Sequence, residues 1–223
     1  MALLKSGLST ERIAANLARV RQEIDSLATG CDRDPSDIEI LAATKYISIE
    51  DMDKLAQAGI TLVGENRAQD LDAKATRHGE SFTWDFIGQL QSRKVRLILP
   101  HVRLIHSVAS ESALAEIERR LDCARPGLSI LLEVNIANEQ GKSGIAPEQL
   151  DAFMARSPVP VAGLMAMPPL TGVPENSRRW FRELRELAHA HDLKQLSMGT
   201  TQDYPVAVAE GATIVRIGTK LYA

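Results

Sequence analysis

Cysteine, aromatic residues and excess positive charge are all scarce in this chain of 223 residues. Its two cysteines, Cys31 and Cys123, lie far apart with no histidine at metal-ligand spacing. The sequence therefore encodes neither a disulfide framework nor a zinc site. The formal net charge is -3, whereas a protein that neutralises nucleic-acid phosphates needs a basic field. We expect a protein with reduced thiols that does not bind nucleic acid.

Long hydrophobic runs are missing as well. Residues 1–7 lack the continuous apolar region of a signal peptide, and no apolar run is long enough to cross a bilayer. No Ser/Gly linker or shift in composition divides the chain. We therefore expect a cytoplasmic protein without membrane contact, folded as a single domain over residues 1–223.

The sequence alternates between two hydrophobic periods. Over residues 9–28, Ile13, Leu17, Val20 and Ile24 recur at steps of three and four, which predicts an amphipathic N-terminal helix. Eight short β-like runs then alternate with helical stretches, as in parallel βαβ units. Eight strands favour an α/β fold closed into a (β/α)8 TIM barrel, with an open doubly wound sheet as the alternative. The runs are 38–44, 61–64, 83–88, 103–107, 129–136, 159–166, 195–198 and 213–217.

Lys45 directly follows the first of these runs. In a barrel it would lie on the face where barrel enzymes carry their chemistry. Small and apolar residues precede it, so we expect a desolvated amine, and desolvation favours the neutral form that attacks a carbonyl. Taken alone, Lys45 is better explained as a solvated lysine where a strand meets a loop.

A second candidate feature lies at the far end of the chain. Ser197 and Gly199 close the seventh run, and Gly218 and Thr219 follow the eighth. In barrels the loops after strands seven and eight commonly bind phosphate through backbone N–H groups and hydroxyls. The alternative is that these are small residues in tight turns. A lysine after strand one would be a neighbour of this cradle once the barrel closes.

Eight segments, taken in order, make the pattern specific. They resemble the pyridoxal phosphate homeostasis protein family, single-domain relatives of the alanine racemase barrel, which is fold type III among pyridoxal 5'-phosphate (PLP) proteins. The similarity covers almost the whole chain from Ile38 onward. The segments are 42–45, 64–69, 84–94, 105–108, 135–144, 163–168, 196–199 and 215–219.

The resemblance implies a role for particular residues. Lys45 would hold PLP as a Schiff base, Ser197, Gly218 and Thr219 would bind its phosphate, and Arg216 would face the pyridine nitrogen. A guanidinium is effectively always protonated, so Arg216 should leave that nitrogen unprotonated. The cofactor would then be a poorer electron sink than one paired with a carboxylate.

Three further residues have two readings each. Asn66 would lie near the ring substituents of the cofactor, or would serve as a strand-to-helix cap. Met165 would contact the cofactor, or would fill the barrel core. Lys142 lies on an expected loop at the cofactor face and would either handle the cofactor transiently or act as a plain loop lysine.

The same resemblance favours storage over catalysis. Related racemases need a second acid/base, a tyrosine carried by a C-terminal domain of the partner subunit, and this sequence stops before any such domain. We therefore expect a monomeric carrier that passes PLP to apo-enzymes. The alternatives are a PLP-dependent racemase or lyase completed by a partner subunit, Tyr46 or Tyr204, and a cofactor-free Schiff-base aldolase that binds a sugar phosphate.

Overall fold

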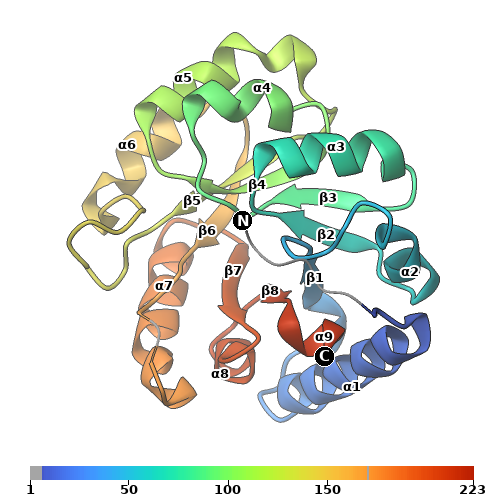
Figure 1. Ribbon diagram of the computed structural model, residues 1–223. Coiled ribbons are helices and arrows are strands. Elements are labelled where there is room, and N and C mark those ends of the chain that lie inside the picture. The colour runs from blue at the N-terminus through green and yellow to red at the C-terminus, as the bar shows by residue number, and fades with distance from the viewer. Residues whose placement is uncertain (1–6, 170) are drawn as a thin grey trace.

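The computed structural model describes residues 7–169 and 171–223, and these form one closed barrel (Figure 1). Its eight strands are all parallel and follow one another in chain order, with the first pairing with the last. The predicted (β/α)8 barrel is confirmed, and the open sheet is wrong. The strands are β1 (Glu39–Ala43), β2 (Leu62–Glu65), β3 (Thr83–Phe86), β4 (Val102–Val108), β5 (Ser129–Glu133), β6 (Val161–Met165), β7 (Gln195–Thr200) and β8 (Ile214–Ile217).

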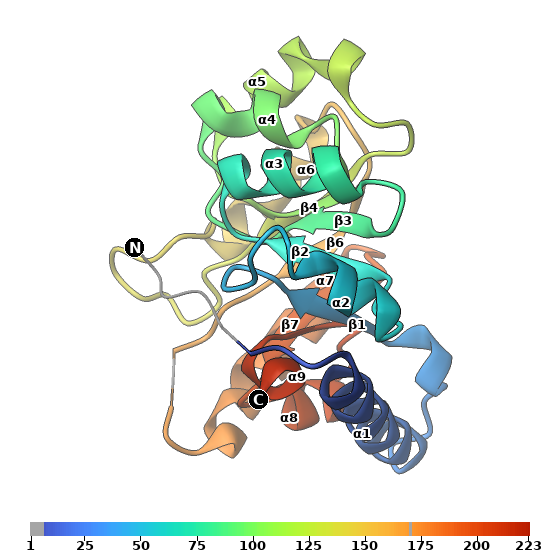
Figure 2. The same ribbon diagram turned by 45° about the vertical axis from the view of Figure 1, so that its right-hand side comes forward.

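The helices surround this barrel, because a parallel crossover must pass over the outside of the sheet (Figure 1). The segments that follow β5 and β6 project from the same end of the barrel (Figure 2). The helices are α1 (Thr10–Thr29), α2 (Met52–Gln57), α3 (Ala68–His78), α4 (Val95–Ile98), α5 (Glu111–Arg119), α6 (Leu150–Ala155), α7 (Arg178–Ala190), α8 (Tyr204–Ala209) and α9 (Thr219–Tyr222).

The predicted N-terminal helix is present as α1, and it packs against the C-terminal part of the chain. Ser9 caps it by accepting a hydrogen bond from the Arg12 backbone N–H at 3.3 Å. Only the short α9 follows β8, and α1 packs against both α8 and α9 (Figure 1). Asn16 donates its amide to the carbonyls of Leu221, at 3.2 Å, and Ala223, at 3.1 Å. The first helix thus packs against the last two helices of the chain.

The barrel interior changes character along the strands. Successive inward side chains of a strand are two residues apart, so the inward side chains of the eight strands stack in layers along the barrel. Leu131 and Ile214 belong to an apolar interior layer, and the next inward residues, Glu133 and Arg216, reach a cleft at the C-terminal ends of the strands. The position of a polar residue on its strand therefore decides whether it reaches the cleft. The apolar layer consists of Leu41, Leu62, Leu104, Leu131, Met165 and Ile214.

Three further observations concern the cysteines, the helix lengths and the potential metal ligands. Cys31 and Cys123 are free, exposed thiols. Over residues 7–169 and 171–223, no helix has the length and apolar character needed to cross a membrane. Nor do the described residues bring three His, Cys, Asp or Glu side chains together in a group suited to a metal ion.

The close contact between β6 and β7 yields a stability prediction. A Cβ added to Gly163 would lie 1.8 Å from the carbonyl oxygen of Gln195 on the neighbouring strand. Gly163→Ala should therefore lower the free energy of unfolding by about 1–3 kcal/mol through overpacking, measured by urea denaturation. Gly172→Ala is the matched control, because a Cβ there meets no atom within 4 Å. Equal midpoints for both variants would contradict this account of strand packing.

Candidate functional site

A cleft of about 470 Å³ opens at the C-terminal ends of the strands. Six of the eight predicted site residues line it, and they come from β1, β2, β6 and β8 and from the turns beyond them. Two predicted residues, Ser197 and Gly199, do not line it. The six are Lys45, Asn66, Met165, Arg216, Gly218 and Thr219, and the remaining lining residues include Tyr46, Ser107, Glu133, Met167, Thr200, Thr201 and Tyr222.

Lys45 lies in the turn beyond β1 rather than in the strand itself. Its amine lies 4.8 Å from the centre of the Tyr46 ring. The side chain is exposed, so the expected desolvated amine is wrong. The physical reason is the strand end: β1 stops at Ala43, and Lys45 stands far enough beyond it to reach solvent. Its access to the cleft, and not burial, makes Lys45 a candidate nucleophile.

Arg216 is held rigidly in the wall of the cleft. One guanidinium nitrogen donates to the carbonyl of Ser197 at 2.7 Å and to its hydroxyl at 2.6 Å. The other donates to the carbonyl of Ala166 and to the sulfur of Met167, both at 3.0 Å. Burial lowers the pKa of Arg216 to about 10, with Asp203 and Glu133 opposing the shift. The guanidinium therefore stays charged at neutral pH.

Ser197 supports Arg216 from inside the barrel. Ser197 is fully buried, and its hydroxyl lies 2.8 Å from Nδ1 of His106, while Nε2 of His106 lies 3.1 Å from Asp85. Desolvation lowers the pKa of His106, so its ring is neutral. The Asp85 carboxylate can only accept, so Nε2 carries the proton and Nδ1 accepts from the Ser197 hydroxyl. In this structure that hydroxyl is committed to His106 and Arg216 and does not reach the cleft.

This polar chain continues toward the opposite end of the barrel. Arg103 donates to Asp85 at 3.0 and 3.2 Å. It also donates to Glu39, on β1, at 2.8 and 2.9 Å. Arg216 is thus the last member of a continuous series of buried or half-buried polar groups that crosses the interior of the barrel.

Of the four residues expected to bind phosphate, Gly218 and Thr219 line the cleft, and Ser197 and Gly199 do not. Gly199 has φ +87°, and a Cβ there would lie 2.5 Å from the Cβ of Ala207, so this glycine lets β7 pack closely against α8. Thr200 and Thr201 line the cleft instead, and the Thr201 hydroxyl accepts from the Gly218 backbone N–H at 3.1 Å. Sequence reasoning missed both threonines. The feature of the sequence that could have identified them is that two hydroxyl-bearing residues directly follow Gly199.

Asn66 and Met165 both lie where a ligand would meet them. The Oδ1 atom of Asn66 is buried and accepts no hydrogen bond within the described part of the chain, although its residue lines the cleft. An orphaned buried acceptor indicates a place for a donor from a ligand. Met165 belongs to the apolar interior layer and also lines the cleft, so it fills the barrel core and is open to a ligand as well.

Glu133 is the functional candidate that sequence reasoning missed. It is the one carboxylic acid among the described residues that line the cleft, at the end of β5. Burial raises its pKa, opposed by a hydrogen bond from the Ser143 hydroxyl at 2.9 Å and by the charge of Arg216. The feature of the sequence that could have identified it is a glutamate at an inward position at the end of an apolar strand pattern.

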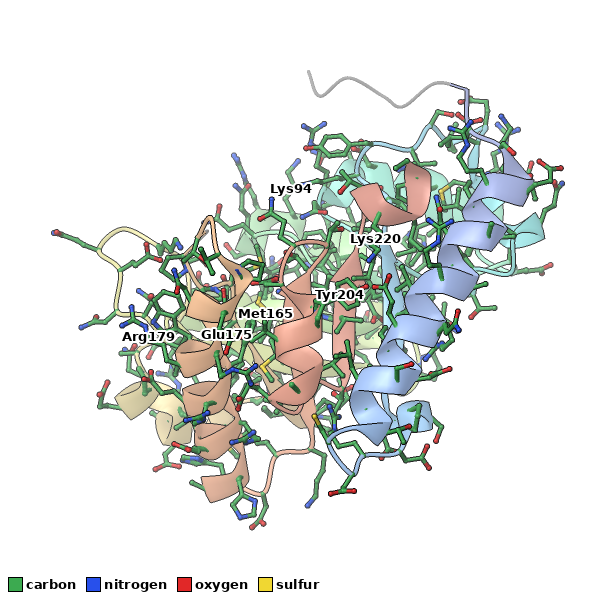
Figure 3. All side chains as sticks on the ribbon, turned by 90° about the horizontal axis from the view of Figure 1, so that it is seen from below. Lys94, Met165, Glu175, Arg179, Tyr204 and Lys220 are labelled. Carbon is green, nitrogen blue, oxygen red and sulfur yellow. The ribbon has the colours of Figure 1, made fainter. Side chains whose placement is uncertain are left out.

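Two of the three tyrosines line the cleft, but Tyr204 does not. Tyr204 is buried beside α1, where its hydroxyl donates to Glu23 and accepts from Lys220 at 2.8 Å (Figure 3). Tyr46 and Tyr222 are cleft residues. Burial raises the pKa of Tyr222, so its phenol stays protonated at neutral pH. Of the two tyrosines expected to complete a racemase site, only Tyr46 is in place.

The buried Glu133 carboxyl yields a prediction for stability against pH. Its raised pKa means that the folded protein binds this proton more tightly than the unfolded chain, so stability present below the ordinary value of 4.5 is lost as pH rises through the folded pKa. Glu133→Gln removes this titration. The variant should gain melting temperature relative to the parent between pH 4 and pH 8, measured by scanning calorimetry.

Glu116→Gln is the control for this experiment. The pKa of Glu116 is lowered by hydrogen bonds from Arg120 and Arg119, so its replacement should bring no gain as pH rises. A constant difference between the Glu133 variant and the parent across the same pH range would show that the carboxyl does not titrate differently in the folded protein.

Comparison with known proteins assigns this chain to a family. The model for the family described as "Alanine racemase, N-terminal domain" matches residues 8–223. The pyridoxal phosphate homeostasis protein of Aquifex aeolicus is 36% identical over 217 residues, covering 92% of this chain and 95% of that protein. Its counterpart in Pseudomonas aeruginosa is also 36% identical, covering 94% of each.

Solved structures agree with this assignment. PipY of Synechococcus elongatus, solved with PLP bound, superposes with a TM-score of 0.79 at 29% identity, covering 95% of this chain and 100% of that one. The lysine/ornithine decarboxylase of Vibrio vulnificus shares the fold alone, with a TM-score of 0.68 at 13% identity over 96% of this chain and 62% of the enzyme. The chain therefore belongs to the pyridoxal phosphate homeostasis protein family, within the alanine racemase N-terminal domain fold.

Proposed function

We propose that this protein binds PLP, holds it as a Schiff base on Lys45, and serves as a carrier in PLP homeostasis without turning over amino acids. The observation that carries the proposal is the convergence of Lys45, Arg216, Gly218 and Thr219 in one cleft. These residues come from opposite ends of the sequence, and they match the three parts of the cofactor: an aldehyde, a ring nitrogen and a phosphate.

The residues of the cleft fit such a cofactor. The orphaned Oδ1 atom of Asn66 offers an acceptor to a ring substituent. The Gly218 backbone and the hydroxyls of Thr201 and Thr219 gather at one side of the cleft and suit a phosphate. Lys45 would join the cofactor through its amine, with loss of water from the aldehyde.

Arg216 bears on what the bound cofactor can do. PLP supplies an electron sink when its ring nitrogen is protonated. Four hydrogen bonds hold the Arg216 guanidinium in the cleft wall, and its positive charge disfavours a proton on a neighbouring ring nitrogen. This arrangement favours retention of the cofactor over chemistry at an amino-acid α-carbon.

The relatives support the same reading. Their names describe PLP homeostasis and no reaction, and PipY has been solved with PLP bound. We extend to this chain the carrier role, delivery to apo forms of PLP-dependent enzymes, a monomeric state and a cytoplasmic location. The exposed position of Lys45 is compatible with transfer to a partner, because the attachment point is open to solvent.

A PLP-dependent racemase or lyase is the second candidate. The observation in its favour is that Tyr46 and Glu133 line the cleft beside Lys45 and each could exchange a proton. The third possibility, a cofactor-free aldolase, would form a Schiff base only with a sugar phosphate and would take up no PLP. The three functions predict different results in the experiments below.

The attachment point is tested with the visible spectrum and with borohydride, which reduces a Schiff base to a stable amine. The parent mixed with PLP should show a Schiff-base band and should retain the cofactor after reduction, with the label on Lys45. Lys45→Ala should lose both signals. Lys54→Ala is the control, since Lys54 lies in α2 and pairs with Asp51. Equal spectra for the parent and Lys45→Ala would remove Lys45 as the attachment point.

Turnover is tested by exchange of the α-proton in deuterated water over a panel of amino acids. A carrier with Arg216 at the ring nitrogen should exchange deuterium no faster than free PLP at the same concentration, because the electron sink is weak. Exchange at rates typical of enzymes, of the order of 1 per second or more, would favour the racemase or lyase. A Glu133→Gln variant that abolished such exchange would identify its base.

A further inference from the structure

A buried ion pair lies directly behind the cleft, outside the set of residues that line it. Lys74 of α3 pairs with Glu65 at the end of β2. Glu65 is fully buried, and Lys74 is only 5% exposed. Removing two charges from water carries a cost that their attraction often fails to recover, so such a pair is weak evidence for stability. The contacts of the ion pair therefore indicate whether it has a role besides stability.

The two side chains of this pair also hydrogen-bond to two residues that adjoin or form the cleft, Thr44 and Asn66. Lys74 donates to the carbonyl of Thr44 at 2.9 Å, and the Thr44 hydroxyl donates to Glu65 at 3.0 Å. The other oxygen of Glu65 accepts from the backbone N–H of Asn66 at 2.9 Å. Thr44 is itself fully buried and is the residue immediately before Lys45.

The contacts place the pair between two parts of the site. On one side it holds the peptide that carries Lys45, and on the other it holds the backbone of Asn66. The side chain of Lys45 is exposed, and its amine lies over the ring of the adjacent Tyr46, so this contact ties it only to the next residue of the same turn. The fixed point for the amine is the backbone at Thr44, and that backbone is bonded to a buried charge pair.

We propose that Glu65 and Lys74 are positioning residues that hold Lys45 and Asn66 at a fixed separation, so that the amine meets the cofactor aldehyde in one geometry. This inference rests on the proposed function, since it concerns attachment of PLP to Lys45. The pair acts through Thr44 and Asn66 and does not itself line the cleft. A misplacement of about 1 Å can slow a reaction roughly a hundredfold.

The decisive variant replaces both charges, as Glu65→Met with Lys74→Met. Exchanging a buried ion pair for apolar side chains of similar volume is often neutral for stability, whereas removing one partner leaves an uncompensated buried charge. The double variant should fold with a melting temperature near that of the parent. It should nevertheless form the borohydride-trapped link at Lys45 at least about tenfold more slowly, because the amine is no longer held.

A milder pair of variants tests the same contact without touching either charge. Thr44→Val keeps the shape of the side chain but loses the hydroxyl that donates to Glu65 at 3.0 Å and, at 3.2 Å, to the carbonyl of Gly64, and Thr44→Ser retains it. The valine variant should link PLP more slowly and the serine variant at the parental rate. These variants keep the test valid if the double variant fails to fold.

A readout without cofactor comes from amide hydrogen exchange of the apo-protein. The Asn66 N–H should exchange about tenfold faster in the double variant, because its carboxylate acceptor is gone. Glu210→Gln is the control for general destabilisation: Glu210 is a buried carboxylate that pairs with Arg178 and Arg185 away from the cleft. It should change neither the linking rate nor the exchange of Asn66.

The outcomes separate the two proposals. A parent that never links PLP to Lys45 would refute the proposed function, while the exchange data would still report whether the pair holds the backbone. A parent that links PLP, together with a folded double variant and Thr44→Val that link it equally fast, would refute positioning and leave the pair with a role in folding only. Slow linkage in folded variants and a parental rate in Thr44→Ser would establish positioning.

Discussion

The site depends on a chain of polar groups that crosses the interior of the barrel and ends at Arg216. Each member fixes the next: Asp85 sets the tautomer of His106, His106 orients the hydroxyl of Ser197, and Ser197 accepts from Arg216. A buried guanidinium without such partners would be costly. The chain therefore makes it possible to keep a positive charge fixed at the wall of an otherwise apolar interior.

Lys45, unlike Arg216, is fixed through its backbone and not through its side chain. Its side chain is exposed, and its backbone is held through Thr44 by the buried charges of Glu65 and Lys74. A fixed cation in the cleft wall and an exposed amine on a fixed backbone would together suit the proposed binding and release of a cofactor. Under the proposed function, this arrangement would retain the aldehyde without supplying the electron sink that turnover requires.

The architecture could be predicted because it follows from local patterns. Eight apolar runs separated by helical stretches require a parallel sheet, and the run of 9–28 has the period of a helix. The site was less predictable. Six of eight expected residues line the cleft, but Ser197 points into the polar chain and Gly199 serves the packing of β7 on α8. Neighbouring residues on a strand face opposite ways, so an error of one position changes the role of a residue.

The sequence by itself determined the fold class and the N-terminal helix, because both depend on hydrophobic periodicity, and the family resemblance singled out Lys45 and Arg216, which both line the cleft. Only the tertiary structure decided that Lys45 is exposed, that Glu133 and Thr201 belong to the cleft, and that Glu65 and Lys74 stand behind it. Those facts depend on which side chains meet when strands distant in sequence become neighbours. Burial and hydrogen-bond partners arise from that meeting, and no local pattern encodes them.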